Sequence, residues 1–485
     1  MNRSSISSVP YDVLKEIFVH CLPKNPFDDR QPNTKIAPML LCQVCSSWRT
    51  VAFASVSLWS HLYFCLAFSP TDSSNPDSLN FGILKNHWQF QFLLWWRKNQ
   101  GILRPSLRID SQFEVPHLED CHLDSSEMAS LFEYITSAQY LELDSAYWRI
   151  IEARIHRGDR VEFPNLHTLF NYSSQFEAFY SVQSLVQNHS ASSLRKLYID
   201  YNAPPHDFTM PGYWGTLTHI FLSIDDLVIP FQSWFTLLRG VPELQWGYFG
   251  FSLTNIASCI FPTTECTLSR LSTITIAIES TGAVGRNFSF ASIFTKFVLP
   301  SLHTLSLYCD CFSWYGHQAI SQLYTILDSA SAITTLALGL NFLSLDYEWT
   351  ENILASLTLA SDTNPIWIHA NCLTNLQLVL QRYNIMNETD AKELLDIFVR
   401  NLFSNSSWLD LDDPECPIQT ITLLNEMFPL ANNLDDTEFS QIFYSKLSEI
   451  AQKKAPNISF QITSKSVFQD TMGDIWNEWR SRATE

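Results

Sequence analysis

Glycine is scarce in this chain, with only 13 glycines in 485 residues, and this limits the phosphate-binding sites it can contain. Loops that cradle phosphates need glycine because the backbone must approach the ligand closely. Gly282 and Gly285 are followed by Arg286 and lack the Gly-Lys-Ser/Thr ending of a phosphate loop. The sequence also contains neither a G-x-S-x-G nucleophile elbow nor an H-E-x-x-H zinc motif. These absences argue against the corresponding classes of enzyme.

Charged residues are also few, at 16 %, and their balance is acidic, with 49 Asp and Glu against 30 Lys and Arg. The formal charge of −19 disfavours nucleic acid and anionic membranes as main partners. Residues 51–68 form the most apolar run, but its serines and short length favour a buried helix and strand over a membrane span. No secretory signal peptide is visible, so we expect a cytoplasmic and/or nuclear location.

The eleven cysteines do not predict a disulfide framework, because they are odd in number and spread thinly along the chain. Cys42 and Cys45 have C-x-x-C spacing, but no matching second pair follows. We interpret both as small apolar residues of a helix, not as zinc ligands. Residues 117–122 contain a loose group of His, Cys and acidic side chains that would bind a metal only adventitiously. We therefore expect no metal and no cofactor.

Residues 8–62 carry the clearest functional pattern. After Pro10, which suits the first turn of a helix, apolar residues lie on one broad helix face: Val13, Leu14, Ile17, Phe18 and Cys21. A second helical stretch has the same three- and four-residue steps: Leu40, Leu41, Val44, Cys45, Trp48 and Val51. Leu58 and Trp59 follow. Helices this short cannot bury all these side chains among themselves, so we expect the rest of the chain or a partner to cover them.

The order of these residues resembles an F-box, in particular the F-boxes of mushroom-type fungi, over roughly the first 62 residues. The elements that carry the resemblance are Pro10, Leu14, Ile17–Phe18, Leu22–Pro23, Val44–Cys45, Trp48–Arg49, Ala52 and Leu58–Trp59. The resemblance implies docking on the Skp-type adaptor of an SCF (cullin–RING) ubiquitin ligase. It assigns adaptor binding to Pro10, Leu14, Ile17, Phe18, Val44, Cys45, Trp48, Leu58 and Trp59. The alternative is an ordinary helical hairpin that packs on the following domain.

Beyond residue 100 the chain repeats the pattern L-x-x-L-x-L. Copies begin at residues 138, 166, 194, 217, 244 (a degenerate copy), 271, 302, 333 and 373, which are 23 to 40 residues apart. Most of these intervals lie in or near the range of leucine-rich repeats. Shorter copies begin at 107, 421 and 458. The segments before several copies have helical periodicity: 128–135, 179–186 and 320–327.

These features predict an α/β protein with a small N-terminal helical F-box followed by a leucine-rich-repeat-like solenoid. We expect parallel strands on its concave face and helices on its convex face. The expected boundaries are 1–64 for the F-box, 65–103 for a connection, 104–465 for the repeats and 466–485 for a C-terminal capping helix. The alternative is a generic α/β domain with several strands of this pattern.

The resemblance then predicts a non-catalytic subunit that recruits a protein substrate to a ubiquitin ligase. It would bind the adaptor, and through it a cullin, by the F-box, and an unknown substrate by the repeats. The alternative is a repeat scaffold that binds a partner without a role in ubiquitin transfer. An enzyme with paired carboxylates at strand ends is a third possibility: Asp144, Asp200, Asp225, Asp226 and Asp310. The sequence does not indicate which residues bind the substrate.

Overall fold

The computed structural model divides the chain into two compact units. The first comprises Met1–Asn202 together with Trp476–Glu485, and the second comprises Ala203–Ile475. The residues that the structure describes are 9–22, 34–66, 68–70, 81–84, 87–111, 126–143, 148, 151, 161–173, 192–201, 214–224, 231–253, 265–280, 294–309, 317–341, 369–381, 416–425, 445–453 and 455–463.

Thirteen of the described strands belong to one parallel sheet, in the order β1-β4-β5-β6-β7-β8-β9-β11-β13-β14-β15-β16-β17. The two units divide this order after β7. The fold class is therefore α/β with a large parallel sheet, in a solenoid-like arrangement. None of the helices in the described part of the chain has the length and apolarity that crossing a membrane requires.

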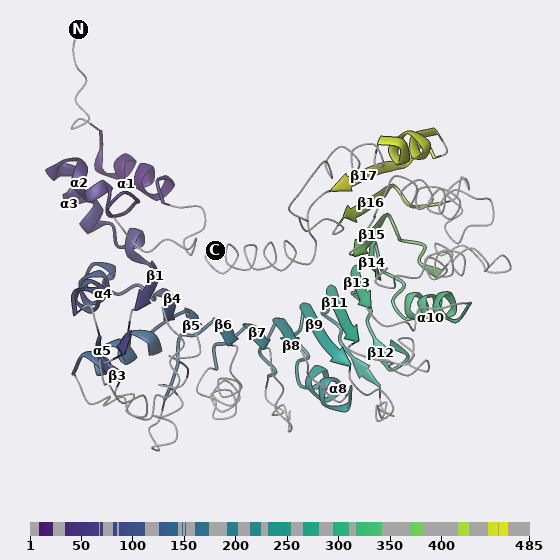
Figure 1. The fold of residues 1–485 in the computed structure, drawn as a ribbon, viewed down its shortest axis with the longest axis horizontal. Helices are drawn as coiled ribbons and strands as arrows, with labels where there is room; N and C mark the ends of the chain where they lie inside the picture. The colour runs from purple at the N-terminus through teal and green to yellow at the C-terminus, as the bar shows by residue number, and fades with distance from the viewer. Residues whose placement is uncertain are drawn as a thin grey trace, which may run out of the picture. The chain divides into compact units, whose positions relative to one another are not determined.

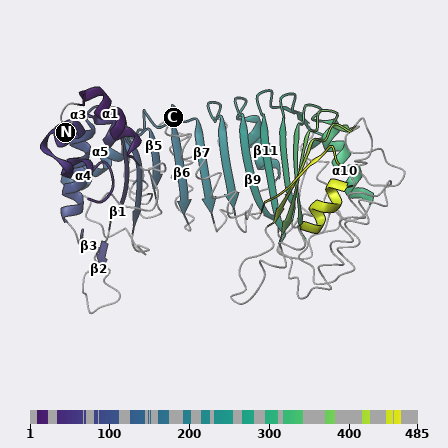
Figure 2. The ribbon, with the colours of Figure 1, turned by 90° about the horizontal axis from the view of Figure 1, so that it is seen from above.

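The first unit begins with four short helices, which we call the N-terminal helices: α1 (Tyr11–His20), α2 (Leu41–Val44), α3 (Ser46–Ala54) and the 3-10 helix η2 (Val56–Trp59). They group at the β1 end of this unit (Figure 1). Its parallel strands are β1 (His61–Leu66), β4 (Ser106–Ser111), β5 (Tyr140–Leu143), β6 (Thr168–Ser173) and β7 (Lys196–Tyr201). Strands β5, β6 and β7 lie side by side in chain order (Figure 2).

The second unit contains eight parallel strands: β8 (His219–Ile224), β9 (Trp246–Leu253), β11 (Thr273–Ser280), β13 (Thr304–Cys309), β14 (Thr335–Asn341), β15 (Asn375–Gln381), β16 (Thr420–Asn425) and β17 (Ser459–Thr463). Backbone hydrogen bonds already join neighbouring repeats just before the strands begin. The N–H of His303 donates to the carbonyl of Ser272, and the N–H of Thr334 donates to that of His303. The repeats therefore stack in a constant register.

The repeated leucines form the core because their register places them in line across the strands. In the first unit one row consists of Leu62, Leu107, Leu141, Leu169 and Leu197, all of which are buried. In the second unit the matching row includes Ile274, Leu305, Leu336, Leu376 and Ile421, also buried. We call the side of each unit's sheet that carries these rows the leucine face. Since side chains alternate along a strand, the intervening residues lie on the opposite face.

Helices connect the strands. The first unit has α4 (His87–Gln100) and α5 (Ser126–Thr136), and the second has α8 (Phe231–Arg239) and α10 (His317–Asp328). In the second unit α8 and α10 lie on one side of the strands (Figure 1). Trp234 of α8 packs edge-on against Phe249, which belongs to the leucine face. Helices therefore cover the leucine face, because its apolar rows need shielding from water.

Two small sheets complete the described elements. Strands β2 (Phe68–Pro70) and β3 (Phe81–Leu84) pair antiparallel, whereas β10 (Cys266–Thr267) and β12 (Phe297–Val298) pair parallel.

The predicted repeats coincide with strands. Each of the nine main copies overlaps a strand between β5 and β15, and the early and late copies overlap β4, β16 and β17. The predicted helices over 128–135 and 320–327 are confirmed as α5 and α10. The sheet also includes β1, which lies before residue 104, where the sequence places the start of the repeats. The predicted helix over 179–186 and the capping helix over 466–485 lie outside the described residues.

Candidate functional site

Helix α1 buries one side and exposes another. Leu14 and Phe18, four residues apart, are buried, whereas Val13 and Ile17 are 48 % and 42 % exposed. Positions four apart share a helix face, so the inner pair faces the other N-terminal helices and the outer pair faces away. Asp12 lies in the first turn, where its negative charge suits the helix N-terminus. Val13 and Ile17 therefore lie on a side of α1 that the other N-terminal helices leave exposed.

The junction between α2 and α3 is braced by two side-chain contacts. The Cys45 sulfur accepts a hydrogen bond from the N–H of Trp48 at 3.4 Å, which caps the start of α3. The Nε of Arg49 donates to the carbonyl of Cys42 at 2.8 Å. Val44, at the end of α2, is 53 % exposed. The exposed Val44 side chain thus lies on a turn whose backbone is held by hydrogen bonds. Burial raises the pKa of the Cys42 thiol.

Two tryptophans organise the interior of the N-terminal helices. The ring of Trp48 lies 4.9 Å from that of Phe18, joining α3 to α1. Trp59 is fully buried, and its Nε1 donates to the carbonyl of Ala52 at 3.0 Å. Trp96 of α4 covers it, with ring centroids 4.9 Å apart and a 2.7 Å hydrogen bond from Trp96 Nε1 to the Trp59 carbonyl. The rest of the chain therefore covers Trp59.

The nine residues that the F-box resemblance assigns to adaptor binding divide into two groups. Five are exposed or half-exposed: Pro10, Ile17, Val44, Cys45 and Trp48. Four are buried: Leu14, Phe18, Leu58 and Trp59. A buried side chain cannot contact a partner unless the helices open. In this structure the four buried residues pack inside the helices that carry the five accessible ones.

Exposed apolar residues are concentrated on the N-terminal helices. Eleven large apolar residues are exposed in the described part of the chain. Eight of them lie on or beside the N-terminal helices, and we refer to these eight collectively as the N-terminal apolar surface: Tyr11, Val13, Ile17, Val19, Leu40, Val44, Phe53 and Val56. Six of these eight were absent from the predicted adaptor-binding set. The outward position of Val13, four residues before Ile17, was the available signal. Such a concentration of exposed apolar side chains marks a candidate protein-binding surface.

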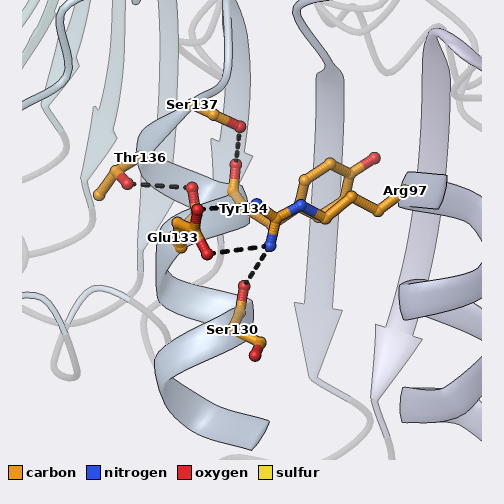
Figure 3. Close-up of polar contacts among 6 residues, drawn as sticks. All are labelled: Arg97, Ser130, Glu133, Tyr134, Thr136 and Ser137. Carbon is orange, nitrogen blue, oxygen red and sulfur yellow. Dashed lines mark hydrogen bonds and ion pairs between the residues drawn. The ribbon is translucent and has the colours of Figure 1, made fainter. Parts of the chain in front are cut away.

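A polar clamp fastens α4 to α5 (Figure 3). Arg97 of α4 reaches α5, where its Nη2 lies 3.0 Å from Glu133 Oε1 and its Nη1 donates to the carbonyl of Ser130 at 3.4 Å. Its guanidinium also lies over the ring of Tyr134. The Tyr134 hydroxyl donates to Gln100 Oε1 at 2.5 Å. This clamp fixes α4 to α5. Because Trp96 of α4 covers Trp59 of η2, the clamp also holds Trp96 in that position.

The electrostatics of the clamp follow from the surroundings of each group. Hydrogen bonding and charge from Arg97 lower the pKa of the Glu133 carboxyl, which is mostly exposed. Burial raises the pKa of the Tyr134 phenol well above its usual value, although Arg97 acts in the opposite direction. Tyr134 therefore remains a neutral hydrogen-bond donor at all physiological pH values.

Titratable side chains do not gather into a metal site in the described residues. Within them, no set of three or more His, Cys, Asp or Glu side chains is arranged to hold a metal ion. Six cysteines are free thiols: Cys21, Cys42, Cys45, Cys266, Cys372 and Cys416. Asp200 lies in β7, but the other four strand-end carboxylates and residues 117–122 fall outside the described residues.

The opposite face of the second unit carries a row of uncharged polar residues. One position per strand contributes to it: Thr273, Thr304, Thr335, Asn375, Thr420 and Ser459. These side chains are half-exposed or exposed. On β8 and β9 the same face has stacked aromatic pairs, with the rings of Phe221 and Tyr248 4.3 Å apart. The row therefore offers hydroxyl and amide groups for hydrogen bonding and carries no charge.

No protein-family model matches the chain, and a search of the curated proteins finds no match. Two features of the chain itself bear on its function: the N-terminal apolar surface and the attachment of the N-terminal helices to the first repeats.

Proposed function

We propose that this protein is the substrate-recruiting F-box subunit of an SCF (cullin–RING) ubiquitin ligase. The N-terminal helices bind the Skp-type adaptor, and through it a cullin, and the repeats bind a protein substrate. The observation that carries this proposal is the N-terminal apolar surface, where Val13, Ile17 and Val44 are exposed on helices whose interior is packed. Exposed apolar residues on short helices suit docking against helices of a partner. The F-box resemblance, which includes Ile17 and Val44, supports the Skp-type adaptor as that partner.

The role of the chain in this proposal is positional. An F-box subunit raises the effective concentration of substrate lysines near the ubiquitin-loaded enzyme, and performs no chemistry itself. Such a role requires the adaptor-binding helices to be fixed to the repeats. The bond between Trp96 and Trp59, and that from the Ser106 N–H to the Ser60 carbonyl at 2.8 Å, supply this attachment within the first unit.

The uncharged row on the opposite face of the second unit is the substrate-binding surface in this proposal. Its half-exposed hydroxyl and amide groups, such as those of Thr304 and Asn375, suit hydrogen bonds to a polypeptide. Parallel strands repeat such groups about every 4.8 Å, so the row can engage an extended partner segment at several points. Photocrosslinkers placed at these positions would identify the substrate.

Binding to the purified Skp-type adaptor tests the proposal. The variant Ile17→Asp/Val44→Asp places charges on the exposed surface and leaves the buried residues intact. We expect its affinity to fall at least about 100-fold, because each lost apolar contact contributes about 1.5–3 kcal/mol. Val298→Asp, at an exposed apolar position of the second unit, is the matched control. Adaptor binding that survives the double substitution, with the fold unchanged by circular dichroism, would contradict the proposal.

Cullin co-purification separates this role from that of a scaffold without ubiquitin transfer. We expect the wild-type chain, and not Ile17→Asp/Val44→Asp, to recover cullin from cells. The crosslinked substrate should also turn over more slowly when the chain is deleted. Adaptor binding without cullin recovery or any effect on substrate turnover would favour the scaffold.

A further inference from the structure

The loop after α4 displays a fully exposed isoleucine on a braced turn. Ile102 is 99 % exposed, the highest value among the large apolar residues described as exposed. Gly101 has a φ of 64°, in the left-handed region where glycine carries no Cβ penalty. The Nε2 of Gln100 donates to the carbonyl of Leu103 at 2.9 Å across the turn. The backbone therefore holds Ile102 in an outward position.

This loop adjoins the N-terminal apolar surface. A Cβ atom added at Gly101 would lie 3.4 Å from Val56 Cγ1, so the loop backbone packs against a member of that surface. Ile102 and Leu103 raise the exposed large apolar residues of this region to ten of the eleven in the described part of the chain, the eleventh being Val298. The loop therefore contacts η2 beside the exposed Val56.

The surroundings of the loop are basic, although the whole chain is acidic. Residues 95–105 contain the basic residues Arg97, Lys98 and Arg104 and no acidic residue, whereas the chain has a formal charge of −19; Arg97 is paired with Glu133. Lys98, before the loop, and Arg104, its last residue, are exposed, as is Arg49 on α3. Positive charge next to exposed apolar side chains is complementary to an acidic segment that also carries apolar residues.

We propose that the loop 101–104 is a second docking element for the Skp-type adaptor, one that binds an acidic segment of it. Apolar side chains of that segment pack on Ile102 and Leu103, and its carboxylates pair with Lys98 and Arg104. This inference rests on the proposed function. A protein is favoured over an anionic membrane because a single acidic segment presents its charge locally to Lys98 and Arg104. An extended anionic bilayer would also face the rest of a chain whose formal charge is −19.

Calorimetric titration of the full chain with the purified adaptor tests the loop. We expect Ile102→Asp to weaken binding about tenfold, as does the loss of one apolar contact within an interface. We expect Lys98→Glu/Arg104→Glu to weaken binding by about the same factor. The affinity of this variant should also fall less than that of wild type when NaCl is raised from about 50 mM to about 500 mM. The matched controls are Val298→Asp and Lys453→Glu, at exposed positions of the second unit, which should change affinity less than about twofold.

The outcomes separate the two proposals. If the loop variants bind like wild type while Ile17→Asp/Val44→Asp does not bind, the loop inference is wrong and the proposed function stands. If wild type itself does not bind the adaptor, both are wrong. Sedimentation with phosphatidylserine vesicles is the third arm. Vesicle binding that Lys98→Glu/Arg104→Glu abolishes, with adaptor affinity unchanged, would assign the loop to membranes and overturn the inference.

Discussion

Trp96 donates a 2.7 Å hydrogen bond from its indole Nε1 to the backbone carbonyl of Trp59, and the two buried rings meet nearly at right angles. This contact joins the last turn of the N-terminal helices to the first helix after β1. Strand β1 begins at His61, two residues after Trp59. The contact therefore ties the N-terminal helices to the start of the sheet. A partner bound to those helices is thereby fixed relative to the first repeats.

Trp96→Phe removes this hydrogen bond and keeps an aromatic ring. We expect the free energy of unfolding to fall by about 1–3 kcal/mol, because a buried carbonyl loses its donor. Trp95→Phe is the matched control, since Trp95 is only half-buried. Urea denaturation followed by circular dichroism measures both. Equal effects of the two substitutions would show that the hydrogen bond contributes nothing beyond ring volume.

Two neighbouring residues of the clamp should differ in their effect on stability. Tyr134→Phe removes a buried hydroxyl bonded to Gln100 and should cost about 1–2 kcal/mol. Glu133→Gln removes the charge of an exposed partner of Arg97 and should cost less than about 1 kcal/mol, because water screens such pairs. Thermal unfolding of the two variants compares them. A larger loss for Glu133→Gln would contradict this ranking.

A buried ion pair crosses β4 and β5 on the opposite face of the first unit. Arg108 Nε lies 3.1 Å from Glu142 Oε1, and the Tyr140 hydroxyl donates to Glu142 Oε2 at 2.9 Å. Arg108→Met leaves a buried charge without its partner and should cost about 3–5 kcal/mol. Arg108→Met/Glu142→Leu should be more stable than Arg108→Met alone. Chemical denaturation decides this, and a double variant less stable than the single one would contradict it.

His61 should make stability depend on pH. Burial lowers the pKa of its imidazole to about 4, so the folded state resists protonation. Between about pH 6.5 and about pH 4 the unfolded state binds the extra proton, and the free energy of unfolding falls as the pH falls, by at most about 3 kcal/mol. Above this window both states are neutral and His61 has no effect.

The variant His61→Gln should flatten this part of the pH profile. Wild type over the same pH range is the reference. Denaturation midpoints at several pH values between these limits measure both slopes. A profile of His61→Gln as steep as that of wild type would show that another group causes the dependence.

Gly247 occupies a position on the leucine face where neighbouring strands have isoleucine. A Cβ atom there would lie 2.6 Å from Cε2 of Phe249, whose ring is fully buried. Gly247→Ala should therefore destabilise the protein by about 1–3 kcal/mol through overpacking. Gly215→Ala is the control, because its nearest atom would be 4.0 Å away. A thermal midpoint unchanged by Gly247→Ala would mean that the phenylalanine ring moves aside freely.

Much of the repeat architecture was predictable because its signal is local. Leucines at alternating strand positions, such as Leu305 and Leu307, must face the same way, and their recurrence predicts stacked strands. Strand β1 was not predicted as a repeat strand, although Leu62 and Phe64 occupy its alternating positions. Leu62 is buried, and β1 joins the sheet by pairing with β4. Its place depends on a neighbour distant in sequence.

The exposure of the N-terminal residues was less predictable. Periodicity correctly placed Leu14 and Phe18 on an apolar helix side, but Val13 and Ile17 belong to the same broad apolar set. Only packing shows which pair is covered. The loop isoleucine, Ile102, gave no periodic signal, since it lies between elements and its exposure depends on the turn that Gly101 permits.

The order of residues alone was enough for the α/β class, the parallel strands and the F-box resemblance, because periodicity and spacing depend only on backbone geometry. Tertiary packing decided which apolar side chains remain available. Trp59 is buried because Trp96 reaches it from 37 residues away, whereas Val44 and Ile102 meet no such neighbour and stay exposed. Burial is a property of contacts between distant segments, and a local pattern cannot specify it.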